Sequence, residues 1–80
     1  MDPIDRIERR LKLHELRVLM AVVEAGSMNK AAERLATSQP AISRAISDLE
    51  HALGVRLLER NPGGILPTQY GEAIIRREAG

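Results

Sequence analysis

Apolar side chains recur at helical spacing along most of the chain. Residues 13–25 carry an apolar stripe and are followed by Gly26, which predicts a helix that ends in a left-handed cap. The stripe consists of Leu13, Leu16, Leu19, Met20 and Val23. Ser27 is a preferred N-cap, so a second, shorter helix is expected over residues 28–36. Its inner face is formed by Ala31, Ala32 and Leu35.

The longest periodic stretch follows in residues 39–53. Ser38 is a good N-cap, and Pro40 lies in the first turn, where a missing N–H does no harm. Apolar positions then repeat every three or four residues, at Ile42, Ala45, Ile46, Leu49 and Leu53. Because Gly54 supplies a C-terminal stop, the pattern predicts a helix over residues 39–53.

The pattern changes after Gly54. Two apolar pairs, at residues 57–58 and 65–66, flank the turn sequence Asn-Pro-Gly-Gly at residues 61–64. This arrangement predicts a small hairpin with a type II turn, and Pro67 limits the second strand. Thr68 is placed to cap a last helix from about Gln69. Residues 1–12 are compatible with a helical N-terminal arm that begins after Asp2.

Composition narrows the class of protein. A chain of 80 residues forms one small domain, and the absence of cysteine excludes disulfides and suits a reducing cytoplasm. No run of 18 apolar residues occurs, so no membrane span is expected. The net charge of +1 neither supports nor excludes a nucleic acid as partner. Tyr70 is the only aromatic residue, which disfavours base stacking on a single strand and leaves a duplex as the plausible nucleic acid.

The two helices expected at 28–36 and 39–53 have the lengths and the short connection of a helix-turn-helix. The longer helix has an inner stripe of Ile42, Ile46 and Leu49. Its outer N-terminal surface carries short or hydrogen-bonding residues, namely Gln39, Pro40, Ser43, Arg44 and Ser47. Glutamine pairs with adenine and arginine with guanine in the major groove, and a helix N-terminus directs N–H groups at phosphates.

Residues 16–71 resemble the N-terminal domain of LysR-type transcriptional regulators. The resemblance is carried by AAERL, SQPAIS, DLE, LGVRLLER and the T-x-x-G within PTQYG. It implies a mainly α-helical, winged helix-turn-helix fold, with a three-helix core, a short β-hairpin wing and the start of a linker helix. The domain would cover residues 13–68, and the linker and dimerisation helix would begin in residues 69–80. A C-terminal domain that binds a small-molecule effector would be absent from this chain.

The same resemblance implies sequence-specific binding of double-stranded DNA in the cytoplasm, by a homodimer or higher oligomer. The expected base-contacting positions are Gln39, Pro40, Ser43 and Arg44, and the expected backbone-contacting positions are Asn29, Lys30, Thr37, Ser38 and Arg60. Arg56 and Arg60 have an alternative role as ion-pair partners of Glu50 or Glu59. Two positions depart from the family. Gly63 stands where the wing often has arginine, and Asp48 stands where a basic residue is common.

Two other function classes are less well supported. A protein-docking module should expose an apolar patch on the helix 39–53, whereas its outer residues are polar. An enzyme would need a nucleophile–base pair or a metal cluster, and Asp48 and Glu50, two residues apart on a helix, face different ways. His14 and His51 are expected to be solvated rather than metal-bound, and no cofactor is expected.

Overall fold

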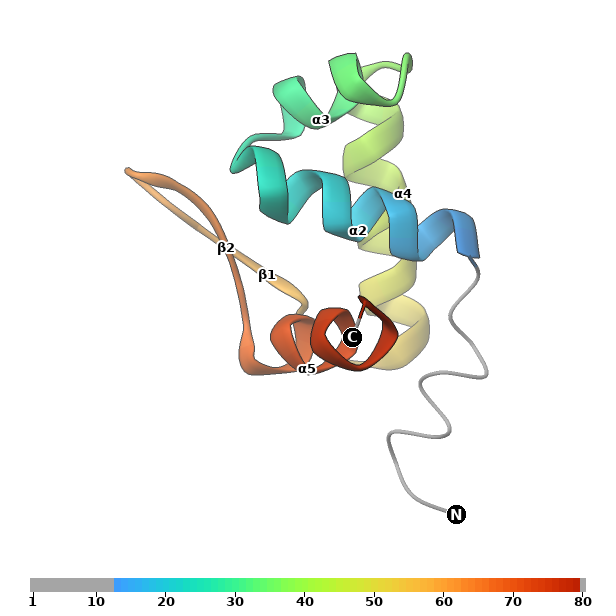
Figure 1. Cartoon of the computed structure of the whole chain (residues 1–80), viewed down its shortest axis with the longest axis vertical. Coiled ribbons are helices and arrows are strands. Elements are labelled where there is room, and N and C mark those ends of the chain that lie inside the picture. Colours follow the sequence, from blue (N-terminus) through green and yellow to red (C-terminus); the bar gives the residue numbers. More distant parts are fainter. Residues whose placement is uncertain (1–12, 80) are drawn as a thin grey trace.

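The structure is a computed structural model that describes residues 13–79, with side chains described for residues 13–77. The elements are α2 (Leu13–Ala25), α3 (Met28–Arg34), α4 (Gln39–Leu53), β1 (Leu58–Asn61), β2 (Gly64–Pro67) and α5 (Gln69–Ala79). Figure 1 shows α4 crossing behind α2, with α3 near one end of α4 and α5 near the other. The β1–β2 hairpin, here called the wing, projects from the side of this helical core. The arm expected over residues 1–12 lies outside the described residues.

The predicted caps define the helix ends. Ser27 Oγ accepts the N–H of Lys30, and Ser38 Oγ accepts the N–H of Ala41, each at 3.3 Å. Gly54 adopts a left-handed φ of 72° and donates its N–H to the Glu50 carbonyl. The bounds predicted for α2 and α4, and the start of α5 after Thr68, are therefore confirmed.

The end of α3 differs from the prediction, because the helix stops at Arg34 rather than at Ala36. Ala36 is left-handed, with a φ of 53°. Its N–H donates to Glu33 O at 3.2 Å, and the Thr37 N–H donates to Ala32 O at 2.9 Å. These two bonds form a Schellman motif, which usually has glycine at the left-handed position. Because the sequence has alanine at this position, the early end of α3 could not be predicted from residue type.

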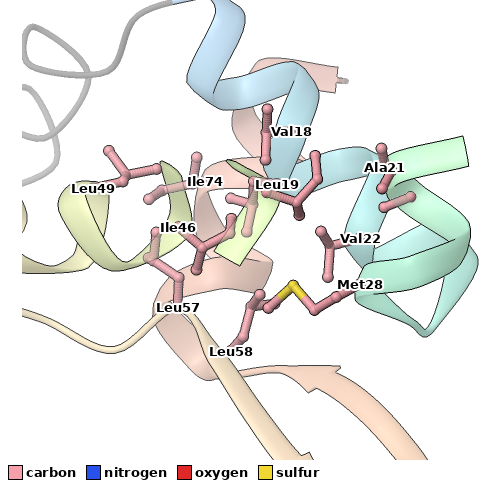
Figure 2. Packing of buried hydrophobic residues seen from close by; sticks show 13 residues of the cluster. Val18, Leu19, Ala21, Val22, Met28, Ile46, Leu49, Leu57, Leu58 and Ile74 are labelled. Atoms are coloured by element: carbon pink, nitrogen blue, oxygen red, sulfur yellow. The ribbon is translucent and has the colours of Figure 1, made fainter. Parts of the chain in front are cut away.

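The core lies between the helices and the base of the wing (Figure 2). Its buried residues are Val18, Leu19, Ala21, Val22, Met28, Ala31, Ala32, Ile42, Ile46, Leu49, Leu57, Leu58 and Ile74. The stripe predicted for α2 is wrong in part, since Leu13 is 74% exposed and the buried arc includes Val18 and Val22 instead. Residues 13–25 are apolar on several sides, and α2 contacts α3, α4, β2 and α5, so periodicity alone did not identify the buried arc.

The wing is a two-stranded antiparallel hairpin in which Arg60 pairs with Ile65 and Asn61 with Gly64. The prediction of a type II turn is wrong. That turn needs a positive φ at Gly63, whereas the positive φ of 131° lies at Gly64. Asn61 Oδ1 accepts the Gly63 N–H at 3.0 Å. This Asx contact closes the turn with a side chain instead of a left-handed glycine.

Candidate nucleic-acid interface

The orientation of α4 is fixed by its buried face. Ile42, Ile46 and Leu49 are between 1% and 3% exposed, so the opposite face of the helix points to solvent. On that outer face, Pro40, Arg44 and Ser47 are exposed, and Gln39 and Ser43 are half-buried. The four predicted base-contacting residues therefore share one accessible surface at the N-terminal end of α4, as the sequence pattern predicted.

Arg44 has an acidic neighbour on α4. Its Nε lies 3.9 Å from Asp48 Oδ2, one turn further along α4, and the two side chains are 85% and 75% exposed. Ion pairs this exposed contribute little to stability. The Arg44 side chain thus stays free to exchange Asp48 for another acceptor.

The predicted backbone-contacting residues of α3 and of the turn before α4 are exposed. Asn29 and Lys30 are exposed in the first turn of α3, and Thr37 and Ser38 are exposed in the turn that leads into α4. The Ser38 hydroxyl already accepts the Ala41 N–H, but its own proton remains available to an external acceptor.

An open groove of about 300 Å³ brings residues of three regions together. Asn29 of α3, Gln39 of α4 and Arg60 of β1 line it, with Ser27, Asn61 and Gly64 among their neighbours. Predicted residues that lie up to 31 positions apart in the sequence therefore face one space between the wing and the N-terminus of α4.

The wing is tied to the helical core at its far end. The Ile65 N–H donates to the Gly26 carbonyl at 3.3 Å, and an ideal Cβ on Gly64 would lie 3.1 Å from the same oxygen. Glycine at position 64 permits this close approach between β2 and the turn that joins α2 to α3. The width of the groove is consequently set by contacts within the protein.

The base of the wing is held by two residues that the sequence did not single out as site residues. Glu50 Oε2 accepts the N–H groups of Leu57 at 2.7 Å and Leu58 at 3.3 Å. Thr68 donates its hydroxyl to Arg56 O and its N–H to Leu57 O, the latter at 2.9 Å. A carboxylate one turn before the glycine cap, followed by an apolar pair, is the sequence signal for the Glu50 contact.

The alternative role of Arg56 and Arg60 as ion-pair partners is wrong. In residues 13–77, where side chains are described, neither arginine lies within ion-pair distance of Glu50 or Glu59, and Glu50 binds backbone N–H groups instead. Arg60 therefore keeps an exposed cation beside the groove.

The described part of the chain has no three histidine or acidic side chains grouped so that they could hold a metal ion. None of its helices has the length and apolarity needed to cross a membrane.

Comparison with known proteins places this geometry in a family. The sequence profile described as "Bacterial regulatory helix-turn-helix protein, lysR family" matches residues 13–72. The HTH-type transcriptional regulator GbpR of Azospirillum brasilense is 43% identical over 70 residues, which are 88% of this chain and 20% of that protein. PcaQ of Agrobacterium fabrum, an HTH-type transcriptional regulator, is 41% identical over 70 residues, or 88% of this chain and 22% of that protein.

Solved structures agree with the sequence comparison. The CbnR DBD–DNA complex has a chain that superposes with a TM-score of 0.79 at 43% identity, covering 86% of this chain and 79% of that one. The BenM DBD/benA site 1 DNA complex gives a TM-score of 0.81 at 39% identity, over 86% and 78% of the two chains. This chain spans about a fifth of the length of the curated relatives it matches. The fold is a winged helix-turn-helix, and the chain belongs to the lysR family of bacterial regulatory helix-turn-helix proteins.

Proposed function

We propose that this chain reads duplex DNA in a sequence-specific manner, as the DNA-binding domain of a transcription regulator. The observation that carries the proposal is the outer face of α4, where the four predicted base-contacting residues are exposed or half-buried beside a groove lined by Asn29, Gln39 and Arg60. The width of a major groove admits one α-helix, and side chains on the helix's N-terminal turns reach the base edges. Two relatives of the same fold are solved as DNA complexes.

Within that arrangement the side chains divide into two groups. Gln39, Pro40, Ser43 and Arg44 contact base edges, with Arg44 bidentate to a guanine and Gln39 to an adenine. The backbone contacts come from Asn29, Lys30, Thr37, Ser38 and Arg60. The phosphate contacts position the domain, and the base contacts supply the sequence preference.

In the whole regulator, residues 13–68 form the DNA-binding unit, and α5 begins a linker helix through which two copies form a dimer. A dimer presents two copies of α4 to half-sites about one helical turn apart, or a multiple of that spacing. A separate C-terminal domain binds a small-molecule effector, the protein acts in the cytoplasm, and the chain itself catalyses no reaction.

Selection from a pool of duplexes with a randomised centre tests this function. The wild-type chain should enrich a defined sequence, and fluorescence anisotropy should show that the enriched duplex binds more tightly than a scrambled one. Failure to enrich any sequence, or equal affinity for both duplexes, would contradict sequence-specific binding.

Arg44→Ala tests the residue assignment. Loss of a bidentate base contact should weaken binding to the enriched duplex by about 1–3 kcal/mol and relax the preference at one base pair. Arg17→Ala is the matched control, since Arg17 is an exposed cation of α2 outside the groove. Equal effects of the two substitutions would remove Arg44 from the base-reading set.

A further inference from the structure

Glu50 joins α4 to the wing through contacts that the proposed DNA contacts do not use. It lies in α4 two turns beyond Ser43, on nearly the same face of the helix. Its carboxylate is half-buried and accepts the N–H groups of Leu57 and Leu58, and Leu58 is the first residue of β1. A side chain of α4 therefore accepts a hydrogen bond from the N–H of the first residue of the wing.

The same short segment is held from its other side by Thr68, which binds the carbonyl oxygens of Arg56 and Leu57. The N–H groups are thus bound by α4 and the carbonyl groups by the residue that caps α5. The Leu57 side chain is fully buried between these two anchors. The backbone at residues 56–58 has little freedom to rotate while both anchors remain.

The orientation of this segment determines where Arg60 points. Side chains two residues apart on a strand lie on the same face, so Arg60 follows the direction of Leu58. Leu58 is 4% exposed and packs in the core, and Arg60, two residues further along β1, lines the groove together with Gln39 and Asn29. Rotation of the peptide at Leu58 would move Arg60 out of this position.

We propose that Glu50 is a positioning residue for DNA binding, which sets the wing and Arg60 at a fixed distance from α4. This inference rests on the proposed function. Glu50 touches no DNA in this arrangement, and it acts only through the two N–H groups that it binds.

Charge alone predicts the opposite effect of removing Glu50. A carboxylate on a helix that faces phosphates repels them, so its removal should tighten binding by simple electrostatics. If Glu50 positions the wing, its loss weakens binding despite that favourable charge change. The sign of the effect therefore separates the two accounts.

The experiment compares Glu50→Ala with Glu50→Gln by anisotropy on the duplex that the wild-type chain enriches, at a temperature where circular dichroism shows each variant folded. Glu50→Ala should bind about 5- to 20-fold more weakly, because two N–H groups lose a charged acceptor. The slope of the logarithm of the binding constant against the logarithm of the salt concentration should become less steep by about one unit, which corresponds to the loss of one phosphate contact. Glu50→Gln keeps an oxygen acceptor and should stay within about threefold of wild type.

A double-mutant cycle with Arg60→Ala measures the coupling between the two residues in DNA binding. A role of Glu50 in stability alone would produce no such coupling. If Glu50 acts through the wing, the effects of Glu50→Ala and Arg60→Ala should be less than additive. Glu24→Ala, which removes an exposed carboxylate of α2, is the charge control and should leave affinity unchanged or slightly raised. If Glu50→Ala does not fold, Glu50→Asp replaces it, since its shorter side chain keeps the charge but does not reach both N–H groups.

Three results would overturn the inference: a folded Glu50→Ala chain that binds as tightly as wild type or more tightly, additive effects with Arg60→Ala, or, in the substitute experiment, Glu50→Asp binding as tightly as Glu50→Gln. A wild-type chain that enriches no duplex would instead contradict the proposed function. The two failures are thus distinguishable.

Discussion

Asp48 is the residue whose charge most directly opposes the proposed role of α4. It lies one turn beyond Arg44 on the outer face, in an ion pair that is open to solvent. Asp48→Asn should raise affinity for the enriched duplex about 3- to 10-fold at low salt, because a charge that repels phosphate is removed and Arg44 loses a competing acceptor. The free energy of unfolding should change by less than about 0.5 kcal/mol, as is usual for an exposed i,i+4 pair. Anisotropy at two salt concentrations and urea titration measure both quantities, and equal affinities at low salt would contradict the expectation.

Gly71 is constrained by close contact rather than by an unusual backbone angle. It lies in the first turn of α5, and a Cβ there would overlap the Leu57 carbonyl oxygen, which also accepts the Thr68 N–H. Gly71→Ala should therefore destabilise the domain by about 2 kcal/mol or more, in the range of overpacked cores. Gly63→Ala is the matched control, because its nearest neighbour would be Asn61 Oδ1 at 3.4 Å and its φ is not positive. Urea unfolding of both variants tests the contrast, and similar losses would show that the contact at Gly71 relaxes easily.

The turn between α3 and α4 contains a residue in a conformation that its side chain disfavours. Ala36 is exposed and left-handed, at a position of the Schellman motif where glycine is common. Ala36→Gly should raise the free energy of unfolding by about 0.5–1 kcal/mol, because the steric cost that it relieves exceeds the added chain entropy. The control, Ala41→Gly within α4, should lower it by up to about 1 kcal/mol. Thermal unfolding measures both, and destabilisation by Ala36→Gly would contradict the argument.

At the level of helices and strands, the features that depend on neighbouring side chains could be predicted from the sequence. Serine caps, glycine stops and the regular stripe of α4 gave the bounds of α2 and α4, since each depends on side chains within a few residues. The end of α3, the buried arc of α2 and the turn at Gly63 were wrong, because each depends on a backbone state or a tertiary contact that residue type does not reveal. The groove that joins Asn29, Gln39 and Arg60 was not predictable either, since it requires the spatial position of the wing. The contact residues themselves came from the family resemblance and stay predictions.

For the molecule as a whole, the large apolar side chains that are exposed in residues 13–77 are few and scattered. The large apolar residues exposed within the described side chains are Leu13, Leu66 and Tyr70, and they come from three different elements. Ile74 of α5 is already used in the core of its own domain. We therefore expect this 80-residue chain to be monomeric at micromolar concentration, because an 11-residue helix is too short for a stable pairing on its own. Sedimentation velocity over a concentration series tests this, and a dimer at micromolar concentration would contradict it.

The hydrogen bond between Ile65 and the Gly26 carbonyl has a consequence for the DNA rather than for the protein. In the proposed complex, the wing would meet the duplex already held at its base by Glu50 and Thr68 and at its far end by Gly26. A mismatch in groove width would then be accommodated in part by bending or twisting of the base pairs. The cost of that deformation depends on sequence and is lowest at flexible pyrimidine–purine steps. Base pairs that no side chain touches would thereby contribute to the choice of binding site.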